Sequence, residues 1–271
     1  MTQHFHQKLF CCFAGLLMLV CTQIASAYDL ASRSPLKVCV IEENFPFSER
    51  QPSDHGLDVD MLAELGKVLM VSVEPIWIMP AARGGINKTL KQSVLAGQCD
   101  LAMGVPERDG SLNDLQALGL ITSKPYLTLG YLMVSLRKSS WNSPADLRKA
   151  GHIGAVLSTP ADLYLKAQNL NRYPYPGNQA LLQSLKTREL DVALVWAAAL
   201  AFDDKSPFPD EALYQSVPLS NTELQTRFVI AANKRDEPLL AKVSQLIEAM
   251  ATDGRLKQLV EKYHLSVFTS N

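Results

Sequence analysis

The chain has 271 residues, of which 47% are apolar and 20% are charged, and its formal net charge is −1. This composition is typical of a globular protein with enough apolar material for one domain or two lobes. The near-zero net charge gives no indication of a nucleic-acid partner or of a polybasic membrane patch.

The N-terminus has the pattern of an export signal. A weakly basic start is followed by an apolar run from Leu9 to Val20 and then by the small-residue sequence Ala25-Ser26-Ala27. This pattern predicts a signal peptide over residues 1–27, with cleavage after Ala27 and a mature periplasmic chain. A lipid anchor at Cys21 and an uncleaved anchor are the alternatives, and the intact mass of the exported protein distinguishes the three.

The first half of the mature chain alternates strand and helix patterns. Continuous apolar or β-rich runs predict three buried strands: Leu36–Ile41, Val71–Met79 and Asp100–Met103. Apolar residues at helical spacing predict two helices: Asp58–Met70 and Asn87–Ala96. We expect Gly104-Val105-Pro106 to turn the chain out of the sheet. This alternation predicts parallel strands covered by helices.

The second half continues the α/β pattern. Four further runs predict strands: Tyr131–Leu136, Ile153–Leu157, Asp191–Val195 and Phe228–Ala231. Helices are predicted over Pro144–Lys149, from Pro160 onward, and over Ala180–Lys186, Leu239–Met250 and Arg255–Tyr263. Ser158 or Thr159 is the expected N-cap of the helix that opens at Pro160. The proline-rich stretch Ser206–Asp210 is expected to be a surface connection.

Two cysteines, Cys39 and Cys99, remain after removal of the predicted signal peptide. Two thiols in an oxidising compartment suggest one disulfide, and both lie on predicted neighbouring strands. Closing a loop of about sixty residues would stabilise the fold by ~4 kcal/mol in the chain-entropy model. The alternative is a pair of buried free thiols, and a free-thiol count in denatured protein with and without reductant distinguishes the two.

Short motifs recur along the chain in a characteristic order. They are Asn44-Phe45-Pro46-Phe47, Gly56-Leu57-Asp58-Val59-Asp60, Cys99-Asp100-Leu101-Ala102-Met103-Gly104, Lys124-Pro125-Tyr126, and Asp253-Gly254-Arg255 with Glu261-Lys262-Tyr263. In this order and spacing they resemble the bacterial extracellular solute-binding proteins of family 3, the amino-acid-binding type. The resemblance implies an α/β fold of the type II periplasmic binding kind, with two lobes, a hinge and an inter-lobe cleft. Lobe one is then expected to comprise residues 36–131 and 227–271, and lobe two residues 132–226.

A narrower resemblance connects the chain with one subgroup of that family. The segments that carry it are Val38-Cys39, Pro46-Phe47-Ser48, Cys99-Asp100 with Gly104-Val105-Pro106, and Asp191-Val192-Ala193 with Trp196. They are similar to the subgroup found with periplasmic quinoprotein methanol and alcohol dehydrogenases. The similarity implies an accessory role, with a quinoprotein dehydrogenase or its cytochrome as the partner. The Gly-Pro that often follows the tryptophan in that subgroup is Ala197-Ala198 here.

The family resemblance also implies where a ligand would bind. Phe47 corresponds to an aromatic residue that lies against the ligand, with a core or loop anchor as the alternative. Ser158-Thr159 corresponds to a helix start where a hydroxyl and amides hold a carboxylate, with ordinary capping as the alternative. Arg108 lies near the arginine that clamps an α-carboxylate, but the usual Thr-x-x-Arg spacing is missing and a solvated arginine is the alternative. Arg83 and Tyr126 complete the cleft candidates, and a loop salt bridge is the alternative for Arg83.

Trp196 is the clearest departure from the family pattern. The strand Asp191–Val195 usually leads to an aspartate that binds the amino group of a ligand, and an indole follows it here. Trp196 offers an N–H donor and a π face, and cation–π attraction of ~0.5–2 kcal/mol does not replace a carboxylate. Asp191 lies too far back along the strand to substitute. We therefore expect a small neutral or acidic ligand, or a cleft that is filled by Trp196 as core.

Catalytic and metal-binding patterns are weak. The mature chain has three histidines, His55, His152 and His264, without cysteine or acidic residues at ligand spacing. We expect no metal, no cofactor and no catalytic residue. The leading hypothesis is a binding protein that acts as a dehydrogenase accessory. The alternatives are a substrate-binding component of an ABC importer for a small polar solute, with its permease as the partner, and a dehydratase-like enzyme. Acidic candidates for the enzyme are Glu42, Glu43 and Glu107, which solvated loop carboxylates explain more simply.

Overall fold

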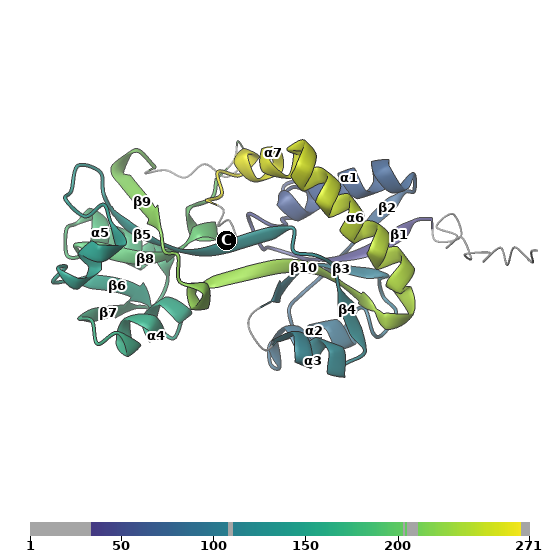
Figure 1. Cartoon of the computed structure of the whole chain (residues 1–271), viewed down its shortest axis with the longest axis horizontal. Helices are drawn as coiled ribbons and strands as arrows, with labels where there is room; N and C mark the ends of the chain where they lie inside the picture. The colour runs from purple at the N-terminus through teal and green to yellow at the C-terminus, as the bar shows by residue number, and fades with distance from the viewer. Residues whose placement is uncertain (1–33, 108–110, 203, 205–210, 267–271) are drawn as a thin grey trace, which may run out of the picture.

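The computed structural model describes residues 34–107, 111–202, 204 and 211–266 (Figure 1). The predicted signal peptide, the predicted connection at 206–210 and Arg108 lie outside the described residues. None of the helices in the described part is long and apolar enough to cross a membrane.

The strands of this part join into one continuous sheet of mixed direction. Its order is β2-β1-β3-β10-β5-β8-β6-β7, with β4 paired to β10 and β9 paired to β5. The strands are β1 (Leu36–Ile41), β2 (Val73–Ile78), β3 (Leu101–Glu107), β4 (Leu120–Thr122), β5 (Leu127–Leu136), β6 (Ile153–Val156), β7 (Arg172–Tyr175), β8 (Val192–Trp196), β9 (Tyr214–Pro218) and β10 (Gln225–Asn233).

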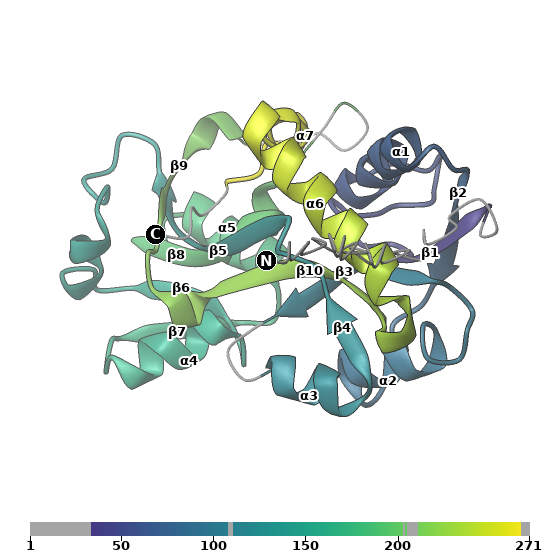
Figure 2. The same cartoon turned by 45° about the vertical axis from the view of Figure 1, so that its right-hand side comes forward.

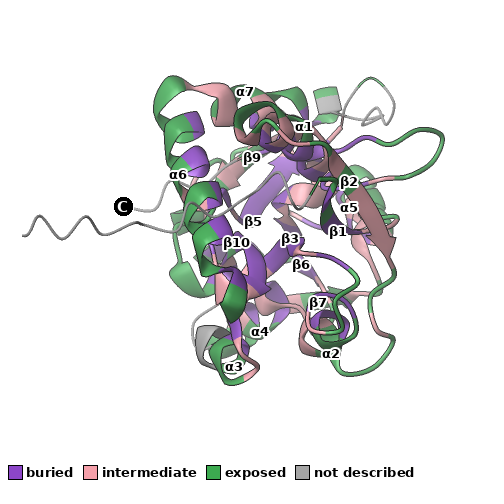
Figure 3. Ribbon diagram, turned by 90° about the vertical axis from the view of Figure 1, so that its right-hand side faces the viewer, coloured by how far each residue is buried: buried purple, intermediate pink, exposed green. Residues whose placement is uncertain are grey.

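Helices cover this sheet on its outer faces, as Figure 3 shows by their exposed outer surfaces. The α-helices are α1 (Leu57–Leu69), α2 (Gly85–Gln92), α3 (Ser111–Ala117), α4 (Pro160–Ala167), α5 (Asn178–Lys186), α6 (Glu237–Asp253) and α7 (Arg255–Lys262). Short 3-10 helices are η2 (Pro144–Arg148), η3 (Ala197–Leu200), η4 (Glu211–Leu213), η5 (Thr222–Leu224) and η6 (Lys234–Asp236). The predicted α/β fold with strands and helices in alternation is confirmed.

Two groups of elements are joined by the long strands β5 and β10, which run between them in Figures 1 and 2. We call the group with β1 to β4 lobe one and the group with β6 to β9 lobe two. Strand β5 pairs with β10 up to Gly130 and with β8 from Tyr131 onward. This change of partner supports the predicted boundary at residues 131 and 132, and we propose the lobe limits 36–131 with 227–271 and 132–226.

Within each lobe the inner strands are parallel. In lobe one β1 pairs in parallel with both β2 and β3, and in lobe two β6 pairs in parallel with both β7 and β8. Parallel strands present all their carboxyl ends at one edge of the sheet. The loops that leave β1, β2, β6 and β8 therefore start from the two sheet edges where a ligand site is expected.

One expectation for lobe one is wrong. Gly104-Val105-Pro106 does not turn the chain out, because these residues continue β3. Gly104 has a positive φ of 68°, and the pairing of β3 with β10 shifts its register between Val229 and Ala231. The irregularity therefore lies inside β3 between Ala102 and Val105, where Gly104 is located, and pairing with β10 continues on both sides of it.

Three short strands were missed in the sequence: β4, β7 and β9. They have only three to five residues each, and β7 and β9 contain proline or polar residues at alternate positions. Proline and polar residues are tolerated in these strands because each lies at an edge of the sheet, and an edge strand needs hydrogen bonds to a neighbouring strand on one side only. Local pattern does not distinguish such segments from loops.

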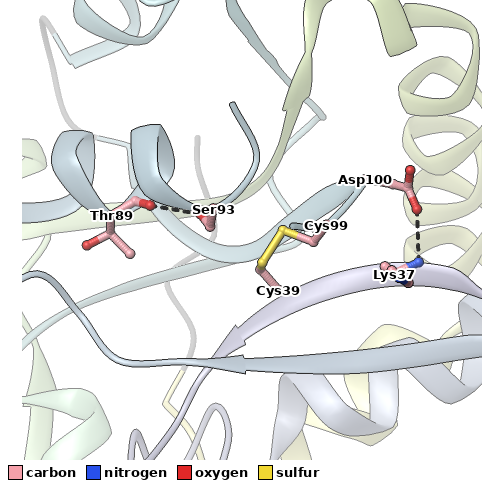
Figure 4. Close-up of a disulfide and its surroundings, with 6 residues drawn as sticks. All are labelled: Lys37, Cys39, Thr89, Ser93, Cys99 and Asp100. Atoms are coloured by element: carbon pink, nitrogen blue, oxygen red, sulfur yellow. Dashed lines mark hydrogen bonds between the residues drawn. A yellow bond between two sulfur atoms is a disulfide. The ribbon is translucent and has the colours of Figure 1, made fainter. Parts of the chain in front are cut away.

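The disulfide expected in lobe one is present (Figure 4). Cys39 on β1 and Cys99 just before β3 are bonded, with 5.6 Å between their Cα atoms. Both residues are buried, at 0% and 5% exposure, inside the apolar cluster that also contains Leu90 and Val94. Beside it, Asp100 accepts a hydrogen bond from the backbone N–H of Lys37 at 3.0 Å, which fixes the same two chain segments a second time.

Candidate functional site

Three of the predicted site residues lie at the carboxyl edges of the parallel strands. Phe47 follows β1, Trp196 ends β8, and Thr159 comes three residues after β6. The register of β6 and β8 pairs Ala155 with Leu194, so the carboxyl ends of these two parallel strands lie side by side. Both lobes thus contribute candidate residues at the edges where parallel strands end.

Aromatic rings connect the two lobes at this position. The ring centroids of Trp196 and Tyr131 are 5.4 Å apart at an interplanar angle of 57°, and those of Trp196 and Phe228 are 6.4 Å apart at 50°. Phe228 in turn lies 4.8 Å from Phe47, at 35°. Tilted contacts at these distances are favourable for aromatic pairs. We call the four residues Phe47, Phe228, Trp196 and Tyr131 the aromatic row.

The aromatic row is largely closed to solvent. Phe47, Phe228 and Tyr131 are 6%, 8% and 7% exposed, and Trp196 is half-buried. The Trp196 indole packs against the two apolar clusters of the core at once. The surface that the row offers to a ligand is therefore apolar, with π faces as its main means of recognition.

No aspartate from β8 reaches the aromatic row. Asp191 lies at the other end of the strand, where its Oδ2 accepts hydrogen bonds from the backbone N–H groups of Gly151 at 2.8 Å and His152 at 2.9 Å. These bonds hold Asp191 to the loop that enters β6. At the carboxyl end of β8, where the family resemblance leads us to expect a carboxylate, the chain has the Trp196 ring.

Ser158 and Thr159 cap helix α4 with internal partners. Thr159 donates from its hydroxyl to the backbone carbonyl of Val156 at 2.6 Å and accepts from the backbone N–H of Asp162 at 3.4 Å. The backbone N–H of Ser158 donates to the Asp162 carboxylate at 3.0 Å. The Ser158 N–H and the Thr159 hydroxyl therefore already have partners in the chain.

Asp162 and Arg172 were not among the predicted site residues. The Asp162 side chain is 5% exposed and pairs with the Arg172 guanidinium, which extends from β7. The pattern Thr159-x-x-Asp162 resembles a capping box and is the signal that would have identified the acid. This internal carboxylate accepts the hydrogen bond of the Ser158 N–H at the start of α4.

Tyr126 is a core residue instead of a cleft residue. It is 2% exposed, and its hydroxyl donates to the Asp58 carboxylate at 2.6 Å. Burial raises the pKa of Asp58 to about 7, and the hydrogen bond from Tyr126 works in the opposite direction. Burial also raises the pKa of Tyr126 well above its usual range, with the Asp58 charge adding to the effect. The pair joins the start of α1 to the residue that precedes β5.

The arginine and acidic candidates do not join the aromatic row. Arg83 is exposed in the turn before α2, and Arg108 lies outside the described residues. Glu107 is not a solvated loop carboxylate, because it ends β3, is 5% exposed and forms a 3.0 Å ion pair with Arg227 on β10. Glu42 lies 3.5 Å from Arg50 and Glu43 is exposed.

The histidines of the described part are separated from one another. His55 Nδ1 lies 2.8 Å from the backbone carbonyl of Ser53, His152 contacts Tyr173, and His264 stacks on Phe202. No group of three or more histidine, cysteine or acidic side chains in the described residues could hold a metal ion. The site is defined by aromatic rings and by internally satisfied polar groups.

Comparison with known proteins gives a family and a fold. The profile of the bacterial extracellular solute-binding proteins, family 3, matches residues 36–266, whereas no curated protein matches the sequence significantly. The solved L-cystine solute receptor of Neisseria gonorrhoeae is similar with a TM-score of 0.67 and 19% identity, covering 89% of this chain and 99% of that chain.

Two other solved structures are similar over the same range. MxaJ from Methlophaga aminisulfidivorans has a TM-score of 0.59 and 20% identity, covering 86% of this chain and 100% of its own. The periplasmic binding protein XoxJ from Methylobacterium extorquens has a TM-score of 0.57 and 18% identity, covering 87% and 100%. These likenesses establish the type II periplasmic binding fold with two lobes. Because the family profile covers nearly all of the described chain and the fold agrees with it, this protein is a member of the bacterial extracellular solute-binding proteins, family 3.

Proposed function

We propose that this protein is an exported solute-binding-type protein that serves as an accessory to a quinoprotein dehydrogenase system. It does not capture amino acids in the usual way of its family. The observation that carries the proposal is the packing of Trp196 against Tyr131 and Phe228. A desolvated ammonium group at this position would have no carboxylate partner, and an unpaired buried charge is costly.

The start of α4 supports the same conclusion. The Ser158 N–H and the Thr159 hydroxyl are occupied by Asp162 and Val156, and Asp162 is neutralised by Arg172. A zwitterionic ligand would need an anion at one end of the site and a set of free donors at the other. The Trp196 ring supplies no anion and these two donors are already occupied, so a small neutral ligand, or no ligand, fits the site best.

The accessory role follows from the subgroup resemblance of the sequence. MxaJ and XoxJ, the solved structures that represent this subgroup, share the fold of the chain. We therefore propose a periplasmic location and a protein partner, a quinoprotein dehydrogenase or its cytochrome. Affinity purification of the tagged protein from native periplasm should retain one of these two proteins. Retention of membrane-embedded importer subunits alone would contradict the accessory role.

Ligand binding is tested by thermal shift, because a ligand that binds only the folded state raises the apparent melting temperature. We expect no shift with lysine, glutamine or cystine at millimolar concentration. The matched variants are Trp196→Asp and Trp196→Phe. A shift with amino acids in Trp196→Asp alone would show that the indole is what removes binding. A large shift in the unchanged protein would contradict the proposal.

A substrate receptor for an ABC importer is the second candidate. It is favoured by the higher TM-score to the L-cystine receptor than to MxaJ or XoxJ. In that case a small polar solute would raise the melting temperature, and purification would retain a permease. Turnover of a solute that disappears in a Glu42→Gln variant would point instead to an enzyme on the same fold.

A further inference from the structure

A further contact connects the lobes besides β5, β10 and the aromatic row. The segment that follows η3 in lobe two contains Phe202, and the segment that follows α7 in lobe one contains Tyr263 and His264. The Phe202 and His264 rings are stacked, with centroids 3.7 Å apart and an interplanar angle of 10°. The backbone N–H of Phe202 also donates to the carbonyl of Tyr263 at 3.3 Å.

The lobe-one side of this contact is firmly anchored. Tyr263 is 0% exposed, and its hydroxyl donates to Asp60 at 2.9 Å and accepts from the backbone N–H of Gly56 at 3.0 Å. Lys262 adds a 2.7 Å ion pair to the same Asp60 carboxylate. The chain after α7, which descends between the lobes in Figure 1, is therefore fixed to the start of α1.

The lobe-two side continues directly from β8, which pairs with β6 in lobe two. Helix η3 follows Trp196 directly, and its residues Ala197 and the following Ala201 are 1% and 9% exposed. One short segment thus contacts Phe228 through the Trp196 ring and His264 through the Phe202 ring. A rotation of lobe two about β5 and β10 would have to break ring contacts at both ends of this segment.

We propose that Phe202 and the turn Tyr263-His264-Leu265 form an inter-lobe latch, which keeps the two lobes in the observed orientation without a ligand. Ordinary binding proteins of this architecture close when a ligand supplies the contacts between the lobes. In this chain the stacked rings and the Phe202–Tyr263 hydrogen bond supply such contacts internally. The relative orientation of the two lobes is then fixed, and the surface that both lobes form together does not depend on a ligand.

The test measures the distance between the lobes by pulsed electron paramagnetic resonance. Spin labels are attached to Lys88→Cys on α2 and Lys166→Cys on α4, both exposed positions in different lobes. The cysteines of the native disulfide do not react with the label. With the latch intact we expect one narrow distance distribution in the absence of ligand. Phe202→Ala and His264→Asn should each add a second population at a different distance.

His264→Asn is included because Phe202→Ala could fail to fold. His264 is exposed and has a positive φ of 50°, a conformation that asparagine tolerates, so the variant removes the ring with little strain. Tyr173→Ala is the matched control, because it removes a histidine–aromatic contact of 5.2 Å with His152 inside lobe two. The control should keep the single narrow distribution. Unchanged distributions in Phe202→Ala and His264→Asn, or a broad distribution in the protein with an intact latch, would overturn the proposal.

Discussion

At the scale of single residues, Trp196 determines the chemistry of the candidate site. The family resemblance leads us to expect a ligand-binding aspartate at this position, whereas the Trp196 ring packs against two apolar clusters of the core. An indole at this position contributes to stability and supplies no charge to the site. Under the proposed function, the same side chain also limits which ligands can bind.

Replacing Trp196 should reveal this structural contribution. Trp196→Ala removes the ring contacts with Tyr131 and Phe228, and we expect the free energy of unfolding to fall by about 2–3 kcal/mol. This is below the cost of a fully buried tryptophan, because Trp196 is only half-buried. Trp196→Phe, which keeps a ring, should lose less than half as much. Equal denaturant midpoints for Trp196→Ala and the unchanged protein would contradict a core role.

A second prediction at the scale of single residues concerns Asp58 and the pH dependence of stability. Its pKa is raised by burial from 3.8 to about 7, so the folded state retains a proton that the unfolded chain releases. Stability from this group is fully present below about pH 4 and is lost as the pH rises to about 7, at most by ~4 kcal/mol. Asp58→Asn should remove this loss, which chemical denaturation at a series of pH values measures.

Asp253 is the control for Asp58, because its pKa is shifted in the opposite direction. Arg255 lowers the pKa of Asp253, so this carboxylate stabilises the fold above the pKa of the unfolded chain and loses that effect as the pH falls. Asp253→Asn should therefore leave the decrease in stability between pH 4 and 7 in place. An unchanged pH dependence in Asp58→Asn would show that Asp58 does not titrate in this range.

At the scale of elements, the disulfide fixes the centre of lobe one. It joins Cys39 on β1 to Cys99, which lies 60 positions later in the sequence and shortly before the neighbouring strand β3. Helix α2 and the loop after it cover the bond, since Leu90 and Val94 belong to the same apolar cluster. The disulfide therefore reduces the conformational entropy of the unfolded chain, and the apolar packing around it stabilises the folded state.

Removing the cross-link should destabilise the protein measurably. For the double variant Cys39→Ala/Cys99→Ala we expect the free energy of unfolding to fall by ~4 kcal/mol, because the unfolded chain regains the entropy of an open loop. Guanidinium unfolding of the oxidised protein and of the double variant gives the difference. A matching stability of the two proteins would mean that the bond constrains neither state.

At the scale of the whole molecule, the largest apolar cluster extends through both lobes. It contains residues of α1 and α6 in lobe one together with Leu181, Leu185 and Ala201 in lobe two. Figure 3 shows buried strands through the centre of this shared core. Two lobes that share a core and a latch should unfold as one cooperative unit.

Tryptophan fluorescence can follow each lobe separately. Trp77 lies on β2 and Trp141 lies shortly before η2 in lobe two. Variants that keep only Trp77 (Trp141→Phe/Trp196→Phe) or only Trp141 (Trp77→Phe/Trp196→Phe) differ from the parent by conservative changes. We expect the two variants to have coincident denaturant midpoints and equal slopes, as in a two-state transition. Clearly separate midpoints would show that the lobes unfold independently.

The sequence by itself determined the α/β class, most of the longer strands and helices, and the family. These features depend on periodicity and on short motifs, which are properties of neighbouring residues. The cysteine pair was also readable, because two cysteines outside a predicted signal peptide favour a single bridge in a protein that is expected to be exported. The prediction failed for β4, β7, β9 and the Gly104 irregularity, where pairing with a distant strand outweighs the local signal.

Only the tertiary structure decided what the candidate site residues do. Phe47, Tyr131, Trp196 and Phe228 are far apart in the sequence, and the meeting of β1, β5, β8 and β10 brings their rings into one row. The same is true of Tyr126 with Asp58 and of Phe202 with His264. The burial and the partners of a side chain depend on which distant segments pack together. A residue pattern can therefore predict a site, but only the packing shows which of its groups remain available to a ligand.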